Sequence, residues 1–125
     1  MVAERFIASV NESSKPQLQM GFFINYDVED ILKQENESTL RYHKGESISM
    51  LDGVLVSIKD EIDCLPYSTT GGTKWLHKRR PCTDDAFCVK RLRLCGAILV
   101  GKTNMHELGA GTTGKNPYYG ASRNP

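Results

Sequence analysis

The sequence lacks any long hydrophobic run. Its longest apolar stretches, such as residues 97–100, fall far short of the roughly 20 residues that a membrane-spanning helix needs. It also lacks a strong charge of either sign, because 16 Lys and Arg residues nearly balance 15 Asp and Glu residues. The overall charge therefore gives no reason to expect nucleic acid or an anionic membrane as partner. Residues 1–10 include Glu4 and Arg5 and do not resemble a signal peptide, so we expect an intracellular protein.

Cysteine pairs of the kind that bind zinc are also missing. The four cysteines form no C-x-x-C pair, and no histidine lies at zinc-finger spacing from them. We therefore predict no metal at these residues and expect free, buried or half-buried thiols in a reducing compartment. The four are Cys64, Cys82, Cys88 and Cys95.

The 125 residues suffice for one small domain, and their pattern predicts alternating helices and strands. A helix is expected over residues 28–40, with Glu35 facing solvent, and a strand over residues 53–59 with alternating side chains. A second helix is predicted to begin at an N-cap Thr83, and a buried strand follows at residues 97–100. This order of strand, helix and strand predicts an α/β fold with a crossover connection.

Residues 96–103, GAILVGKT, match the phosphate-binding pattern G-x-x-x-x-G-K-[ST]. A phosphate loop needs a flexible middle whose N–H groups point at the phosphate. Here the middle is the apolar segment 97–100, which predicts a strand. We therefore expect that Lys102 does not bind phosphate.

Lys59 follows an apolar strand and precedes three carboxylates, Asp60, Glu61 and Asp63. Taken alone, this pattern is typical of a charged cluster kept in water at a strand end. An acidic metal site from the three carboxylates is an alternative, although no second ligand cluster accompanies it.

Four blocks of sequence occur in an order that changes this interpretation. Residues 51–60, LDGVLVSIKD, resemble the D-G-x-P-hydrophobic-x-hydrophobic-K-D opening of the amidase-signature family, with Leu55 in place of the usual proline. Residues 69–73, TTGGT, resemble its T-T-x-G-S/T segment. Residues 99–107, LVGKTNMHE, and residues 116–125, NPYYGASRNP, resemble two later blocks. Within the family, the chain is most similar to the plant-type fatty acid amide hydrolases.

The resemblance implies a fold and a domain division. Family members have an α/β fold with a mixed β-sheet core flanked by helices, which we expect to be incomplete here. Residues 1–45 would form a helical and loop lead-in. Residues 46–125 would form the N-terminal part of the amidase-signature domain, truncated before the motifs that contain serine.

The resemblance also implies a chemistry, hydrolysis of amides by a Ser–Ser–Lys triad. One serine attacks the carbonyl, a second relays the proton, and a lysine that matches Lys59 is the base. A lysine that acts as a base must release its proton, which burial favours because it penalises the charged form. The resemblance places both serines after Pro125, so we expect the fragment alone to be inactive.

The remaining expectations concern the substrate and partners. The segment Gly109, Ala110, Gly111 and Thr112 would line the acyl pocket in a complete relative, although a plain glycine loop is an equal alternative. The implied substrate is a small-molecule amide, with fatty amides of the N-acylethanolamine type favoured and no cofactor. Membrane association, including attachment to endomembranes, and homo-oligomer formation remain open for a longer protein. Two other functions stay open, an amidase acting on another amide class and a non-catalytic remnant or interaction module.

Overall fold

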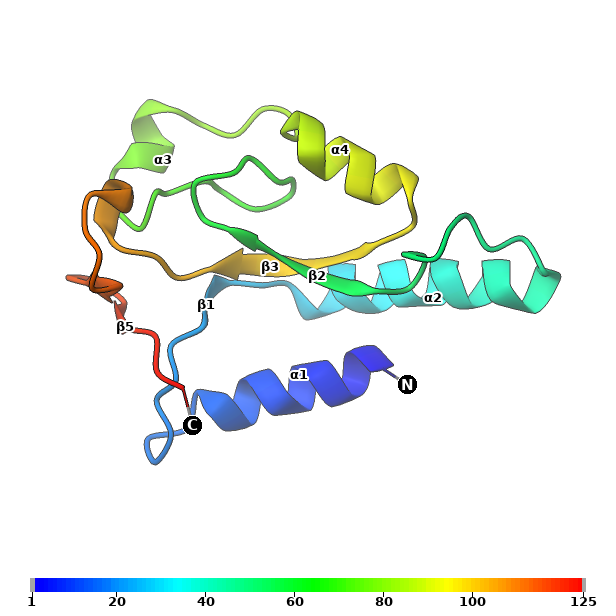
Figure 1. Ribbon diagram of the computed structural model, residues 1–125, viewed down its shortest axis with the longest axis horizontal. Coiled ribbons are helices and arrows are strands. Elements are labelled where there is room, and N and C mark those ends of the chain that lie inside the picture. Colours follow the sequence, from blue (N-terminus) through cyan, green and yellow to red (C-terminus); the bar gives the residue numbers. More distant parts are fainter. Residues whose placement is uncertain (1, 125) are drawn as a thin grey trace.

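A computed structural model describes residues 2–124 and confirms the α/β class (Figure 1). The sheet has three strands in the order β1-β3-β2, in which β3 pairs parallel with β2 and antiparallel with β1. Helices α1 and α2 cover one face and α4 covers the other, so the predicted crossover between two parallel strands is present. The helices are α1 (Val2–Ser13), α2 (Val28–Lys44), α3 (Leu76–Arg79), α4 (Phe87–Leu94) and the 3₁₀ turn η1 (Glu107–Gly109). The strands are β1 (Phe23–Asn25), β2 (Leu55–Lys59), β3 (Ile98–Thr103), β4 (Lys115–Asn116) and β5 (Gly120–Ala121), and β4 and β5 form a separate hairpin.

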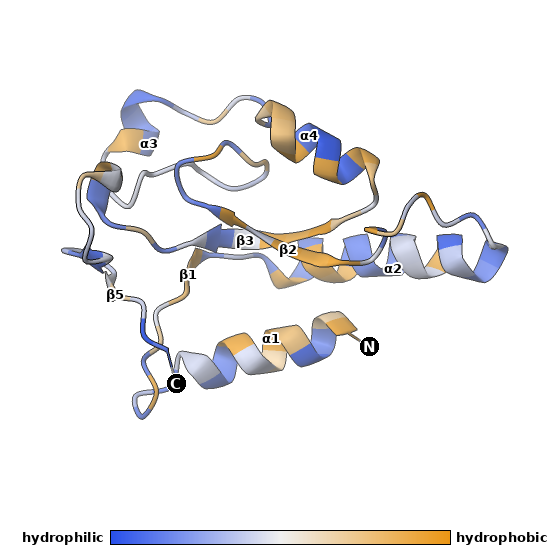
Figure 2. Ribbon diagram, in the orientation of Figure 1, coloured by the Kyte–Doolittle hydropathy of each residue, from blue (hydrophilic) through white to orange (hydrophobic). Residues whose placement is uncertain are grey.

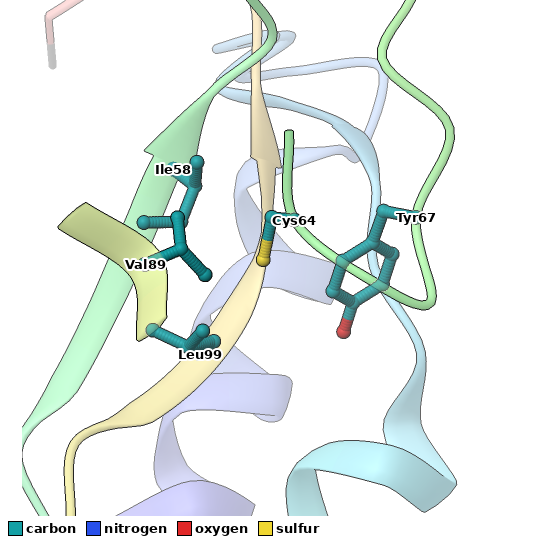
Figure 3. Close-up of a cluster of buried hydrophobic side chains, with 5 residues drawn as sticks. All are labelled: Ile58, Cys64, Tyr67, Val89 and Leu99. Carbon is teal, nitrogen blue, oxygen red and sulfur yellow. The ribbon is translucent and has the colours of Figure 1, made fainter. Parts of the chain in front are cut away.

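The central strand β3 separates two small hydrophobic cores. Ile98 and Val100 pack against α1 and α2, while Leu99 packs against Val89 of α4. Figure 3 shows the second core, where the side chains of β2, β3 and α4 meet Cys64 and Tyr67 from the loop after β2. The hydropathy colouring in Figure 2 shows the same apolar centre, with the apolar segments of β2 and β3 lying against α2. The predicted buried strand is thus confirmed, and it extends three residues further than expected, to Thr103.

A β-bulge at Gly101 changes the face to which β3 directs its last side chains. Val56 pairs with Leu99 and Ile58 pairs with Lys102, so β3 carries one more residue than β2 over this interval. Gly101 adopts φ +129°, and a Cβ there would lie 2.4 Å from the carbonyl oxygen of Asn25. Only glycine suits this conformation and this approach of β1. The bulge turns Lys102 toward the α4 side of the sheet rather than the side of Val100.

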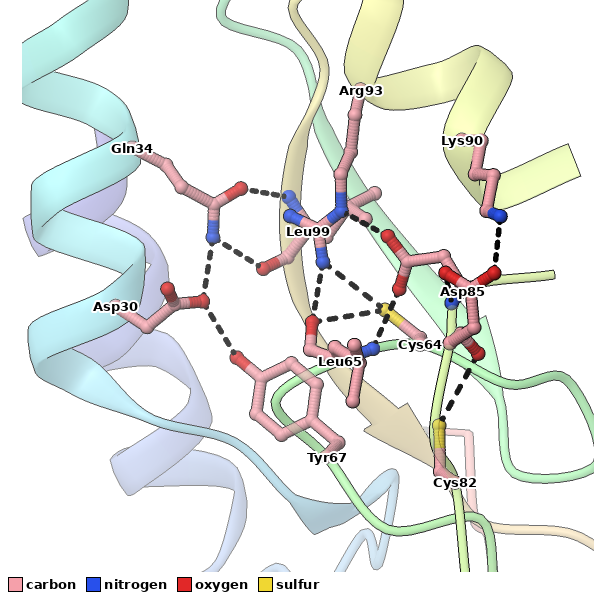
Figure 4. A network of polar contacts seen from close by, with 11 residues as sticks. Asp30, Gln34, Cys64, Leu65, Tyr67, Cys82, Asp85, Lys90, Arg93 and Leu99 are labelled. Atoms are coloured by element: carbon pink, nitrogen blue, oxygen red, sulfur yellow. Dashed lines mark hydrogen bonds and ion pairs between the residues drawn. The ribbon is translucent and has the colours of Figure 1, made fainter. Parts of the chain in front are cut away.

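The short strand β1 leaves part of the backbone of β3 without a partner strand, and α2 supplies the missing hydrogen bonds. The Gln34 amide accepts from Leu99 N at 2.9 Å and donates to Leu99 O at 3.1 Å (Figure 4). The same amide donates to Asp30 at 2.8 Å, which orients it. A side-chain amide thus replaces a strand, because a buried backbone group left unpaired is costly.

Helix α2 confirms the predicted helix, but the predicted exposure of one of its residues, Glu35, is wrong. It extends beyond the predicted end to Lys44, where Gly45 at φ +73° ends it. The prediction that Glu35 faces solvent is wrong, because its carboxylate is buried and accepts from Ala3 N at 2.9 Å. This contact docks the first turn of α1, a helix that was not predicted, onto α2. Residues of the first 45 therefore pack on the same sheet, while the domain division at residue 46 stays a prediction.

Helix α4 begins later than predicted. Its N-cap is Ala86, with no side-chain capping bond, so the prediction of a Thr83 cap is wrong. The Asp85 carboxylate is used elsewhere, since it accepts from Leu65 N and from Arg93 Nε, both at 2.7 Å (Figure 4). The preceding acidic residues thus tie the loop after β2 to the end of α4 instead of starting the helix.

The cysteines differ sharply in exposure. All four are free thiols, as predicted, but Cys88 is exposed on α4, contrary to the expectation. Cys64 is fully buried, and burial raises the pKa of its thiol to about 11.

We predict that Cys88 reacts with iodoacetamide at mildly alkaline pH well before Cys64. The thiolate is the reactive form, and Cys64 is both inaccessible and protonated under these conditions. Peptide mass spectrometry over a labelling time course measures both rates. After unfolding in denaturant the two cysteines should react alike, and equal rates before unfolding would contradict the described core.

We also predict that the isolated chain self-associates and unfolds without a sharp transition. In the described residues one edge of β2 has no partner strand, and Phe87 and Leu94 on α4 are each 74% exposed. Sedimentation velocity should show concentration-dependent oligomers that a Phe87→Glu, Leu94→Glu variant reduces. A monomeric profile with a cooperative thermal transition would contradict this expectation.

Candidate functional site

Lys59 lies at the carboxyl end of β2, opposite Thr103 of β3. Its side chain is 50% exposed, and Nζ is 2.9 Å from Oε1 of Glu61, which is similarly exposed. The alternation predicts Leu55 and Ser57 on the same face, where Ser57 is also exposed and Leu55 is half-buried. The predicted strand end is therefore confirmed, and in this chain the Lys59 ammonium stands in water beside a carboxylate.

Asp60, the next residue, points inward and is fully buried. Its carboxylate accepts from Thr70 N at 3.2 Å, from Gly72 N at 3.0 Å and from the Thr70 hydroxyl. The loop of residues 69–73 thus wraps around this carboxylate, and Gly72 adopts φ +69° to direct its N–H inward. The expectation of a solvated charge cluster is wrong for Asp60 for this reason.

Lys102 completes the buried part of the site. Its side chain has no exposed surface, and Nζ lies 3.4 Å from Oδ1 of Asp60. Nζ donates to the carbonyl of Ile62 at 2.7 Å and to the Thr69 hydroxyl at 3.0 Å. Three oxygen partners compensate an ammonium group that would otherwise be very costly to bury. The interior position also keeps Nζ away from any phosphate, in agreement with the sequence prediction.

The role of Lys102 as a buried partner was missed from the sequence. Its neighbours Asp60 and Thr69 are 42 and 33 residues distant in the chain, as the numbering shows. The available signal was a lysine directly after a glycine in an apolar strand, because such a glycine often marks a bulge.

The three carboxylates after Lys59 do not converge on a common point. Asp60 faces Lys102, Glu61 pairs with Lys59, and Asp63 accepts from Arg80 Nη1 at 2.9 Å. The hydrogen bonds from Arg80 hold the pKa of Asp63 below its usual value. Across residues 2–124 no three His, Cys, Asp or Glu side chains are grouped as a metal site would require.

The segment Gly109, Ala110, Gly111 and Thr112 is exposed and begins at the last residue of η1. Gly111 lies flat against the ring of His106, because a Cβ at this position would be 2.2 Å from Cε1 of that ring. His106 therefore packs within the loop. The pocket-lining role of the segment stays a prediction.

This segment borders an apolar groove that adjoins Lys59. The groove is lined by Leu76, Met105 and Leu108, with Glu61 and Arg80 at its rim. Glu61 therefore touches both the groove and the ammonium of Lys59. Met105 is buried, as expected for a core residue.

Asn116 joins the later motif blocks to the earlier ones. Its buried amide Nδ2 donates to the carbonyls of Gly72 and Met105, both at 2.8 Å, and Oδ1 accepts from Tyr118 N. A Cβ on Gly72 would lie 2.6 Å from this Nδ2, so the glycine is required for the contact. Pro125, the last residue of this motif block, lies outside the described residues.

Comparisons with known proteins agree with this arrangement of motifs. The Amidase family model matches residues 7–125. The chain is 51% identical over 124 residues to a fatty acid amide hydrolase of Arabidopsis thaliana and 46% identical over 125 residues to one of Medicago truncatula. These matches cover 99% and 100% of the chain but 20% and 21% of the relatives, so the chain spans about a fifth of their length.

Solved structures give the same result. The peptide amidase of Stenotrophomonas maltophilia superposes with a TM-score of 0.84 at 27% identity, covering 98% of this chain and 26% of that one. A 6-aminohexanoate cyclic dimer hydrolase superposes with a TM-score of 0.77 at 26% identity, covering 98% and 23%. With motif blocks, buried contacts and fold in agreement, the chain belongs to the amidase family.

We predict that the purified chain binds no ATP through Lys102. The ammonium group is enclosed and already has three oxygen partners. Isothermal titration with ATP and magnesium should show no saturable heat. Saturable binding that Lys102→Ala abolishes, and that Lys90→Ala on α4 leaves intact, would overturn this expectation.

Proposed function

We propose that this chain is part of an amide hydrolase that acts on fatty acid amides, with Lys59 as the general base. The observation that carries the proposal is its similarity to plant relatives named fatty acid amide hydrolase, at 46–51% identity across the chain. Relatives that are named as components of a glutamyl-tRNA(Gln) amidotransferase are less similar, at 33–41%. That difference favours fatty amides, such as N-acylethanolamines, over another amide class.

The position of Lys59 suits a base whose partners come from elsewhere in a longer protein. Its side chain extends from the end of an edge strand and is half-exposed, so a serine hydroxyl from elsewhere in a longer protein can reach Nζ. Covering this edge would bury the amine, and burial favours the neutral form that accepts a proton. The backbone next to Lys59 is held in place, because the carboxylate of the following residue, Asp60, accepts hydrogen bonds from Thr70 N and Gly72 N.

The proton path follows from the Ser–Ser–Lys chemistry of the family. The attacking serine adds to the amide carbonyl and loses its proton to the relay serine, which passes its own proton to neutral Lys59. The proton then returns along the same route to the departing amine, which leaves the acyl group as an ester on the attacking serine. Water, deprotonated along the same route, then cleaves this ester, releases the acid and restores the serine. Lys59 therefore acts twice, first as base and then as the source of the proton.

Serines within the chain are poor candidates for the other two roles. Ser49 donates to the carbonyl of Cys95, and Ser122 donates to that of Gly21, so both serve the backbone. Ser57 shares a strand face with Lys59, but its sequence context is an apolar strand and not the glycine-rich motif that carries the serines of the family. We propose that the serines come from outside these 125 residues, and a non-catalytic remnant is the alternative that the following experiment addresses.

A hybrid enzyme tests the role of Lys59. In it, the matching segment of the Arabidopsis thaliana relative is replaced by this chain. The hybrid should hydrolyse a fatty amide, and Lys59→Ala should lower kcat by about 10²–10⁴-fold, the usual contribution of a general base. The loss should shrink at high pH, where hydroxide partly replaces the base.

Two controls make the result decisive. Lys74→Ala, which removes an exposed lysine away from β2, should leave turnover unchanged, and the 125-residue chain alone should show no hydrolysis. Normal turnover of the Lys59→Ala hybrid would refute the base assignment. A folded but inactive hybrid would favour the remnant, and Lys59-dependent hydrolysis by the short chain would refute the need for outside serines.

A further inference from the structure

The proposed base, Lys59, and the candidate pocket segment of residues 109–112 lie near each other, although they are far apart in the chain. Glu61 lies between them, because its Oε1 pairs with Nζ of Lys59 and its Oε2 is 3.6 Å from the Cβ position of Gly109. An exposed ion pair of this kind holds two flexible side chains only weakly. The distance between Lys59 and the segment must therefore be fixed by another part of the structure.

The loop of residues 69–73 joins these two parts through the backbone of one residue, Gly71. Its N–H donates to the carbonyl of Asp60, the residue directly after Lys59, at 2.9 Å. Its carbonyl accepts from Leu108 N in η1 at 2.8 Å. The end of the strand that carries the base and the turn that precedes the pocket segment are therefore both attached to Gly71.

The shape of this loop depends on the buried carboxylate of Asp60. The loop contains no helix or strand, and Gly71 and Gly72 adopt φ +59° and +69°, so regular backbone hydrogen bonding does not stabilise it. Instead, the carboxylate accepts from the N–H groups of Thr70 and Gly72 and from the Thr70 hydroxyl. Removing this acceptor would leave buried and half-buried donors unpaired, which favours a different conformation of the loop.

Lys102 supplies the charge opposite Asp60 and contacts the segments on both sides. Its Nζ donates to the carbonyl of Ile62, which follows β2, and to the hydroxyl of Thr69, which begins the loop. A buried ion pair alone does not indicate a function, because apolar residues of similar volume often replace such pairs without loss of stability. This pair differs in that its partners belong to the segments that place Lys59 and η1.

We propose that Asp60 and Lys102 are positioning residues for the general base, an inference that rests on the proposed role of Lys59. The buried pair holds the loop of residues 69–73, and the loop fixes how the Lys59 amine lies relative to the candidate pocket segment. Neither residue takes part in the proton transfer itself. A displacement of about 1 Å between catalytic groups can lower turnover about 10²-fold, so loss of the pair should act on kcat more than on KM.

A double-mutant cycle in the hybrid enzyme tests whether the pair acts through Lys59. Asp60→Asn should lower kcat about 10²-fold when Lys59 is present, with KM changed less than about threefold. In the Lys59→Ala hybrid, the same substitution should change the residual turnover less than about twofold, because the effects of residues that act as a unit are not additive. A purely structural effect would lower turnover by the same factor in both backgrounds.

A second buried ion pair provides the matched control. Asp52 precedes β2, whereas Lys59 ends it, and the Asp52 carboxylate accepts from Arg41 Nε at 2.9 Å and from Arg41 Nη2 at 2.7 Å. Asp52→Asn should lower the thermal midpoint, as Asp60→Asn should. At a temperature well below that midpoint, however, it should leave kcat within about twofold of the unmodified hybrid.

A variant that lacks both charges keeps the test valid where Asp60→Asn fails to fold. The combination Asp60→Asn, Lys102→Met leaves no unpaired buried charge, so it should recover much of the thermal midpoint. Its kcat should stay low, because one amide oxygen cannot accept all the hydrogen bonds that the carboxylate accepts. Recovery of kcat together with stability would show that the pair serves stability alone.

A cross-linking measurement tests the same geometry without turnover. Ala110 is exposed within the pocket segment, so in an Ala110→Cys hybrid a short reagent that joins an amine to a thiol should link Lys59 to the introduced thiol. Mass spectrometry identifies this link and measures its rate. Asp60→Asn should lower the rate severalfold and Asp52→Asn should not, and equal rates would contradict the positioning role even in an inactive hybrid.

The possible outcomes separate this inference from the proposed function. Normal turnover of the Lys59→Ala hybrid would refute the base and, with it, any residue that positions the base. A Lys59-dependent hybrid that Asp60→Asn leaves unaffected, or impairs equally in both backgrounds, would refute the positioning role alone. A loss of kcat confined to the background that retains Lys59, and absent from Asp52→Asn, would establish it.

Discussion

Complete burial of the Lys102 ammonium is the constraint on which the centre of this structure depends. A buried cation must be given oxygen partners, and here they come from three places in the loop after β2. One of these partners, Asp60, in turn requires the N–H groups of Thr70 and Gly72. The carbonyl of Gly72 in turn accepts a hydrogen bond from the side-chain amide of Asn116. Four separated motif blocks are thus joined by a single chain of polar contacts.

The arrangement also explains why two lysines on paired strands have opposite environments. Ile58 is opposite Lys102, and Lys59 is opposite Thr103. Without the extra residue at Gly101, the alternation of β3 would direct Lys102 toward the α1 and α2 side. A glycine bulge in β3 therefore places Lys102 in the interior, whereas Lys59 at the end of β2 stays half-exposed.

Much of the fold could be predicted from the sequence where local pattern and tertiary structure agree. The alternation along β2 and the apolar run of β3 are local signals, and each was confirmed. Predictions were wrong where a residue serves a distant partner. Glu35 was expected in water but docks α1, and the helix expected to begin at Thr83 begins later because Asp85 holds Leu65 and Arg93 instead. Neither partner can be identified from spacing.

The candidate site shows the same division. Lys59 was identified through a resemblance that spans several blocks, and its place at a strand end follows from the pattern of β2. The buried pairing of Asp60 with Lys102 could not be foreseen, because it requires knowing the parallel register and the bulge. Charge alone does not predict which side chains are buried, because the adjacent carboxylates Asp60 and Glu61 differ completely in exposure.

The strand order has a consequence for biosynthesis. The central strand β3 is the last of the three to leave the ribosome, and both neighbours, β1 and β2, pair only with it. Until β3 emerges, the nascent chain carries two strands with open edges and no sheet to join, a state in which chaperones commonly bind. The many contacts between residues far apart in sequence also make sheet closure a late and slow event. Each ribosome must therefore complete about four fifths of the segment, through Thr103, before this sheet can exist.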